Sequence, residues 1–297
     1  MNYKLQPGLS LKKNIVTVAE DEVNASLKSI DEMNIHEAVH NIRKRFKKIR
    51  ALARLVRDEM GEENYKNINI FYRDFGRELS ELRDLTAHLE TIQALRQSYG
   101  DHLYANFFNS LTKEIQALRD KLEEELKEKK FFSEYIPRQL RLASKKKVTW
   151  PVEKDDIQII LPSIKRVYKR GRKAMLKAEE EPTAAVYHEW RKRVKYLWYQ
   201  LRLLEDAWPN LFDAWEDEVH SLANFLGDDH DLVVLKEKIE NGSLEIPDKQ
   251  KELLLAIIKK SSENLRKKAH EIGKLIYAEE PKTFKNRIKN YAENGWK

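Results

Sequence analysis

Cysteine is absent from the 297-residue chain, and glycine and proline are scarce, with nine and eight residues. Without cysteine the chain can hold neither a disulfide framework nor a metal centre built on thiolates. With so little glycine and proline it is neither collagen-like nor a low-complexity chain. Hydrophobic residues make up 41% of the sequence, which is enough for a sizeable core at this length. We therefore expect a folded globular protein.

Long apolar runs are missing as well. No stretch of about 18 uncharged apolar residues occurs that could span a membrane. Residues 1–11 also lack the apolar segment of a secretory signal. We therefore expect no membrane insertion and a cytoplasmic location.

Charge is abundant and unevenly distributed. Charged residues make up 35% of the chain, against about 25% in an average protein. The segments 40–57, 165–177 and 188–202 contain 20 of the 56 Lys and Arg residues and one acid, Glu189. The rest of the chain has 36 basic and 48 acidic residues. Such a concentration of positive charge indicates a polyanionic partner.

The apolar residues follow a helical period almost throughout. They recur at three- and four-residue spacing, as at Val39, Ile42 and Phe46, and no alternating strand pattern interrupts them. Breaks are predicted at Gly61, 100–101, 147–151, Pro182, Pro209, Gly227, 241–247 and Pro281. Long amphipathic helices with short connections predict an all-α protein of antiparallel bundles, with a central boundary at 145–151.

An internal repeat relates the two sides of that boundary. A histidine followed by a run of cations occurs twice, 148 residues apart, as His40, Arg43, Lys44, Arg45 and Lys47 and as His188, Arg191, Lys192, Arg193 and Lys195. A second echo, that is a second pair of similar segments, follows the two copies: residues 79–85 resemble residues 226–232, and Asp84 aligns with Asp231. Two related helical halves are predicted.

Each copy of the repeat places its cations on one stripe of a helix. The first stripe comprises His40, Arg43, Lys44, Lys47 and Arg54, with Arg50 at its edge, and the second comprises His188, Arg191, Lys192, Lys195 and Arg202. Both stripes border the apolar seam, so they can face one groove if the halves pack symmetrically. Arg45 and Lys48 point elsewhere.

These features together resemble the CHAD family, the conserved histidine α-helical domain, over roughly residues 10–280. The resemblance implies two similar antiparallel four-helix bundles related by pseudo-two-fold symmetry. Here they would be residues 1–148 and 149–297 of one domain spanning 1–297. It also implies that inorganic polyphosphate binds in a basic groove or pore between the halves. An association of the protein with polyphosphate granules in the cytoplasm stays open. Some members carry an additional triphosphate-tunnel enzyme domain, and since none is visible, the chain is similar to a stand-alone member.

Both stripes suit a phosphate chain, which offers only oxygen acceptors and repels carboxylates. Arginine supplies paired donors, lysine a point charge and histidine a donor that charges at mildly acidic pH. Another basic helix adds further candidates on both sides of its seam, namely Lys165, Arg166, Lys169, Arg170, Arg172 and Lys173. Its counterpart in 10–33 is rich in acids, so we expect more contacts from the second half.

Other interpretations of the basic stripes stay open. They could bind RNA or DNA, although base stacking would require exposed aromatic residues, for which Tyr199 is the only obvious candidate within the stripes. They could also receive an acidic protein segment, or be solvated helix faces.

No catalytic motif, cofactor or metal is predicted, since phosphate loops, nucleophile elbows and metal-ligating motifs are all missing. Asp84 and Asp231 are expected to support the cations or cap helices, because the consecutive side chains of 228–231 diverge too far to share a metal ion. The scattered histidines are interpreted as structural or surface residues, namely His36, His88, His102, His220 and His270.

Overall fold

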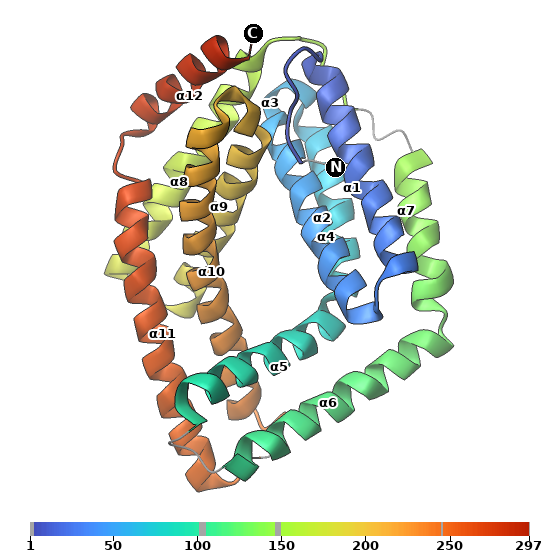
Figure 1. The fold of residues 1–297 in the computed structure, drawn as a ribbon, viewed down its shortest axis with the longest axis vertical. Helices are drawn as coiled ribbons and strands as arrows, with labels where there is room; N and C mark the ends of the chain where they lie inside the picture. The colour runs from blue at the N-terminus through green and yellow to red at the C-terminus, as the bar shows by residue number, and fades with distance from the viewer. Residues whose placement is uncertain (1–2, 101–104, 146–149, 245, 297) are drawn as a thin grey trace.

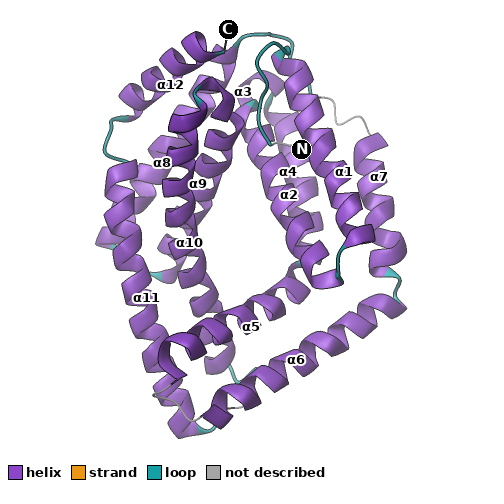
Figure 2. Ribbon diagram, in the orientation of Figure 1, coloured by secondary structure: helices purple, strands orange, loops and turns teal. Residues whose placement is uncertain are grey.

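The computed structural model describes residues 3–100, 105–145, 150–244 and 246–296. Within these ranges the protein is helical and contains no strand (Figure 2). The expected all-α class is confirmed. His102 and most of the predicted boundary at 145–151 lie outside the described residues.

The first part of the chain forms α1 (Leu11–Glu32), α2 (Ile35–Leu55), α3 (Arg57–Met60), α4 (Glu62–Glu78), α5 (Ser80–Tyr99), α6 (Ala105–Glu128), a π-helical turn η2 (Phe131–Tyr135) and α7 (Ile136–Lys145). α1 packs on α2 and α7, and α2 packs on α4. α5 and α6 pack on each other and run across the molecule, away from α1 (Figure 1).

The second part forms a 3₁₀ turn η3 (Ile157–Ile160), α8 (Leu161–Glu180), α9 (Ala184–Leu203), a second 3₁₀ turn η4 (Glu205–Ala207), α10 (Pro209–Glu240), α11 (Asp248–Ile276) and α12 (Pro281–Gly295). α9 lies between α8 and α10, α11 packs along α10, and α12 packs on α8. Contacts of α2 with α9, and of α5 with α10, join the two parts.

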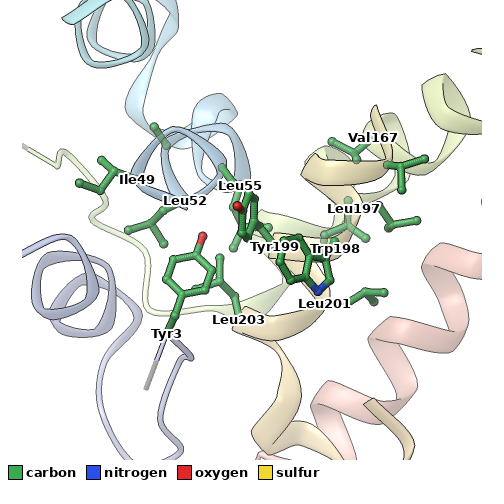
Figure 3. Close-up of a cluster of buried hydrophobic side chains, with 14 of the residues drawn as sticks. Tyr3, Ile49, Leu52, Leu55, Val167, Leu197, Trp198, Tyr199, Leu201 and Leu203 are labelled. Atoms are coloured by element: carbon green, nitrogen blue, oxygen red, sulfur yellow. The ribbon is translucent and has the colours of Figure 1, made fainter. Parts of the chain in front are cut away.

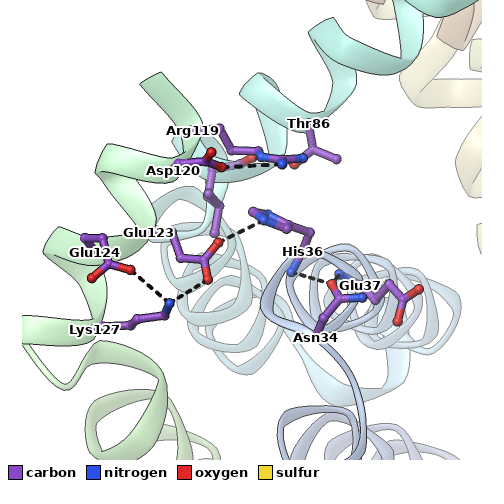
Figure 4. Close-up of polar contacts among 10 residues, drawn as sticks. Asn34, His36, Glu37, Thr86, Arg119, Asp120, Glu123, Glu124 and Lys127 are labelled. Carbon is purple, nitrogen blue, oxygen red and sulfur yellow. Dashed lines mark hydrogen bonds and ion pairs between the residues drawn. The ribbon is translucent and has the colours of Figure 1, made fainter. Parts of the chain in front are cut away.

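Local sequence signals explain where several helices begin. The Asn34 side chain accepts hydrogen bonds from the backbone N–H groups of His36 and Glu37, both at 3.1 Å, and so caps α2 (Figure 4). Pro209 and Pro281 occupy the first positions of α10 and α12, where a missing N–H is tolerated. His36 also reaches Glu123 of α6 at 3.0 Å, which ties α6 to α2.

The predicted break at Gly227 is wrong, because α10 continues through it. An interior glycine destabilises a helix by only about 1 kcal/mol relative to alanine, and the buried Leu222, Leu226 and Leu232 keep the helical period on both sides. The corresponding break in the first half falls at Leu79, between α4 and α5, where neither glycine nor proline marks it.

Two hydrophobic clusters hold the helices together. The larger one joins both parts of the chain where α2 meets α9, with Leu52 and Leu55 facing Tyr199 (Figure 3). Tyr3 completes it and donates a hydrogen bond to the carbonyl of Lys48 at 2.8 Å. The smaller cluster lies at the far end and combines α5, α6, α10 and α11 through residues such as Ile92 and Leu235. α5 and α6 thus bury their apolar faces against the second part of the chain.

Candidate functional site

A cavity of about 450 Å³ opens where α2, α5, α9 and α10 meet. Six lysines and arginines and four histidines line it: Arg43, Lys44, Lys47, Arg83, Arg191, Lys195, His40, His188, His220 and His230. Seven of these ten residues belong to the two stripes predicted from the repeat. The contact between α2 and α9 brings the stripes together, as the sequence suggested.

Six lysines and arginines against four carboxylates leave the lining of the cavity with a positive formal charge, and its cations lie close enough to lower one another's pKa values. Burial lowers the pKa of Lys195 to about 8, with Arg191 as the largest charged contributor. Burial and the nearby Arg191 and Lys195 hold the pKa of Lys47 well below its usual value. The pKa values of Arg43 and Arg191 are lowered in the same direction, mainly by burial. Each shift means that the charged form is destabilised until an anion arrives.

Most of these cations have no ion-pair partner. Among the described residues, Arg43, Lys44, Lys47, Arg191 and Lys195 form no ion pair, whereas Arg83 contacts Glu90 at 2.9 Å. Cations just outside the cavity are paired instead: Arg45 and Lys48 both contact Glu22, at 3.0 and 2.9 Å. Leaving these cations unpaired costs stability, which a bound anion would recover.

Three residues that line the cavity also have buried polar atoms without a hydrogen-bond partner. Within the described residues, the Nη1 of Arg83, the Nδ1 of His188 and the Nε of Arg191 are buried and have no partner. Buried polar atoms are normally satisfied, and an unsatisfied one costs about 1–3 kcal/mol. The same feature occurs outside the cavity, at Arg54 and Arg119 for example, so the ligand is indicated by the unpaired cations and not by these covered atoms.

Carboxylates line the same cavity, among them the two aspartates that were expected to support the cations, Asp84 and Asp231. Burial raises the pKa values of Asp84, Asp228 and Asp231. Asp84 supports the charge of Arg43, and Asp231 supports that of Arg191. This agrees with the predicted supporting role of the two aspartates. Within the described residues, no three His, Asp or Glu side chains lie close enough together to hold a metal ion.

The histidines lie against the walls of the cavity. The rings of His188 and His230 are 4.6 Å apart, and His220 stacks on Trp198 at 4.2 Å. Burial lowers the pKa values of His40 and His188, and it lowers that of His230 to about 3. These histidines are therefore neutral at pH 7 before a ligand binds.

Arg83, His220 and His230 were not predicted as site residues. Two of them carried a signal, because Arg83 and His230 occupy equivalent positions in the second echo, next to Asp84 and Asp231. His220 carried none. The cavity draws four of its six lysines and arginines from the first half, so the expected excess of contacts from the second half does not hold for the cavity.

The ten remaining predicted residues lie outside the cavity: Arg50, Arg54, Lys165, Arg166, Lys169, Arg170, Arg172, Lys173, Lys192 and Arg202. Three of them, Arg54, Arg166 and Arg170, form a second cluster with Arg57 and Arg193. Loss of hydration, and then the charges of the four neighbouring arginines, lower the pKa of Arg170. In this cluster Arg54 lies over the ring of Tyr196 at 4.1 Å, and Arg166 pairs with Asp58 at 2.7 Å.

The others have separate surroundings. Arg50 donates a hydrogen bond to Asn69 at 3.0 Å, and Arg172 contacts Glu280 at 2.8 Å. Lys192 contacts Glu189 at 2.5 Å, and Arg202 contacts Glu216 at 3.3 Å. Lys169 and Lys173 are exposed on α8, and Lys165 is half-buried there.

Comparisons with known proteins agree on one family. The sequence model of the CHAD domain matches residues 21–240. The crystal structure of the CHAD domain from the plant Ricinus communis superposes with a TM-score of 0.60 and 16% sequence identity, covering 89% of this chain and 90% of that one. None of the curated proteins matches the chain. Among the described residues, no helix combines the length and the apolar character needed to cross a membrane.

Proposed function

The chain belongs to the CHAD family, and from this premise we propose that it binds inorganic polyphosphate in the cavity between α2, α5, α9 and α10 without catalysing a reaction on it. CHAD domains are a helical family associated with polyphosphate binding, and they are generally non-catalytic binding modules. The observation that carries the proposal is the convergence of six lysines and arginines, five of them free of ion pairs among the described residues, on one cavity.

The chemistry of the cavity favours phosphate over other anions. A phosphate chain presents acceptor oxygens at every unit, so it can accept hydrogen bonds from several cations of the cavity at once. It also supplies the negative charge that the crowded Lys47 and Lys195 lack. Electrostatic binding of this kind needs no recognition of a sequence.

A chain longer than the cavity must continue over the surface. The second arginine cluster, with Arg54, Arg166 and Arg170, provides further cations where α2, α3, α8 and α9 approach one another. We propose these three residues as secondary contacts for long chains, because Asp58 already neutralises Arg166 in part.

We also propose that residues 1–148 and 149–297 are duplicated halves of a single domain. The order of helices supports this: α1, α2, α4, α6 and α7 are followed 143 to 150 residues later by the starts of α8, α9, α10, α11 and α12. α4 and α5 together correspond to the long α10. The packing pairs repeat too, with α1 on α2 as α8 on α9, and α1 on α7 as α8 on α12.

The nucleic-acid alternative lacks its stacking platform in the cavity. Tyr199 and Trp198 line the cavity but are only 2% and 3% exposed, so neither can stack on a base in the way that single-stranded nucleic acids require. An acidic protein segment has no observation in its favour.

Isothermal titration with long-chain polyphosphate at physiological salt tests the proposal, repeated with equal charge of single-stranded RNA or duplex DNA as competitor. We expect tight binding that neither nucleic acid displaces. Preferential binding of RNA or DNA would replace the proposed ligand, and survival of a co-purified protein partner after polyphosphatase digestion would favour the acidic-segment alternative.

A further inference from the structure

A second cavity of about 360 Å³ adjoins the first, between α5, α10 and α11. The two cavities share Glu90, Asp228 and Asp231 in their linings, so these carboxylates stand at the boundary between them. The volume falls within the range of small-molecule sites, which is about 300–1,000 Å³.

The second cavity has a different chemistry from the first. Its lining contains no lysine, arginine or histidine. Leu95, Leu232 and Leu265 give it apolar walls, while Ser98, Tyr99 and Asn264 add neutral polar groups. Among the described residues, Ser98 and Asn264 make no side-chain hydrogen bond, so both remain available to a ligand. A bare phosphate chain has neither an apolar surface nor a donor to place here.

We propose that the two cavities together bind a nucleoside oligophosphate, a short phosphate chain that ends in a nucleoside. This inference rests on the proposed phosphate binding in the first cavity. The second cavity would be the site that distinguishes a nucleotide from inorganic polyphosphate.

The order of chemical groups along such a ligand matches the order along the cavities. The phosphates meet the cations of the first cavity, of which Lys47, Arg191 and Lys195 are the most crowded. The ribose then meets the shared carboxylates, and acidic side chains are common acceptors for ribose hydroxyls. The base enters the second cavity, where the half-buried Leu265 and Tyr99 can cover its faces and the neutral polar groups meet its edge.

The carboxylates are the informative part of this arrangement. Phosphate alone is repelled by Asp228 and Asp231, whereas ribose hydroxyls can donate hydrogen bonds to them. Within the first cavity Asp228 and Asp231 support the charges of Arg191 and Lys195, and a nucleoside would also give them hydroxyl groups from which to accept hydrogen bonds. Their presence at the junction of a charged and a neutral cavity is the observation that favours a mixed ligand.

Calorimetry with ATP, tripolyphosphate and adenosine tests the inference. We expect ATP to bind at least about ten-fold more tightly than tripolyphosphate, and adenosine to bind more weakly than ATP because it lacks the phosphates. If ATP binds no more tightly than tripolyphosphate, the inference is overturned and the proposed function still stands. If long-chain polyphosphate, tripolyphosphate and ATP all fail to bind, both fall.

Two variants separate the nucleoside contribution. Ala94→Trp fills the second cavity from an exposed position on α5, and should reduce ATP affinity to the tripolyphosphate level while leaving tripolyphosphate unchanged. Gln93→Trp is the matched control, since Gln93 is exposed on the same helix and lines neither cavity. Equal effects of the two substitutions on ATP would overturn the inference.

Asp228→Asn separates the two ligands by the ratio of their affinities. The substitution removes support for the charges of Arg191 and Lys195, which affects both ligands, and it replaces a charged acceptor for the ribose by a weaker amide oxygen, which affects ATP alone. The affinity for ATP should therefore fall more than that for tripolyphosphate, and a change of equal size for both ligands would overturn the inference.

Discussion

Raising the pH from 7 to 9 should weaken polyphosphate binding about ten-fold through Lys195 alone. The pKa of this lysine is about 8 in the free protein because the side chain is buried and lies near Arg191 on its own helix and Lys44 on α2. Asp228 and Asp231 on α10 offset this lowering only in part. A bound polyanion raises that pKa, so binding takes up a proton. Since the free-state pKa is the lower one, the contribution of Lys195 to affinity is nearly complete at pH 7 and is lost as the pH rises through 8.

The measurement is isothermal titration with long-chain polyphosphate at pH 7, 8 and 9, each in two buffers with different ionisation heats, which counts the protons taken up. Lys195→Arg keeps the charge and removes the titration, so its profile should be flatter than that of the native protein. Lys47 shifts in the same direction, and the double change with Lys47→Arg should flatten the profile further. Equal affinities at pH 7 and pH 9, or a Lys195→Arg profile as steep as the native one, would refute the reasoning.

Three further predictions concern the same site and the core around it. Arg43→Glu with Arg191→Glu should weaken polyphosphate binding by at least about 100-fold, since each charge-assisted hydrogen bond contributes about 1.5–3 kcal/mol. The helical circular dichroism of this variant should persist. The matched control is Lys12→Glu with Lys13→Glu, both exposed on α1, which should have little effect on binding. Affinity should also rise from pH 8 to pH 6 as ligand restores the lowered pKa values of His40 and His188; a flat titration in that range would mean that the histidines do not titrate on binding. Gly171→Ala should lower the free energy of unfolding by about 1–3 kcal/mol in a urea titration, because its Cβ would lie 2.3 Å from the Tyr277 hydroxyl, whereas Gly76→Ala, with its nearest atom at 3.8 Å, should not be destabilising.

Sequence periodicity predicted the all-α class, although the breaks read from the sequence included one at Gly227 that the structure lacks and none at Leu79. It placed His40, Arg43 and Lys47 on one stripe of α2, and the repeat identified the equivalent stripe of α9. Four residues of the first stripe and three of the second line the cavity. The predicted stripes agree with the lining of the cavity because the period of a helix determines which of its residues share a face.

Periodicity does not determine which helix lies opposite a given face, and the missed residues follow from that. Arg83 reaches the cavity because the chain bends at Leu79 and directs α5 across the molecule. The bend lies at Leu79, whose side chain is packed in the core and only 1% exposed. Because position 79 is neither glycine nor proline, the sequence gives no signal for it. Arg202 lies on the predicted stripe, but its neighbour Glu216 comes from α10, an encounter that only the folded structure supplies.

The smaller hydrophobic cluster has a consequence for synthesis of the chain on the ribosome. α5 and α6 bury Ile92, Leu95 and Phe108 against residues of α10 and α11 that extend to Ile258. Roughly 130 residues must therefore be translated after α6 before its partners exist, which at 5–20 residues per second takes on the order of ten seconds or more. Throughout that interval the nascent chain presents two amphipathic helices without their partners, and these are the surfaces that a chaperone would shield.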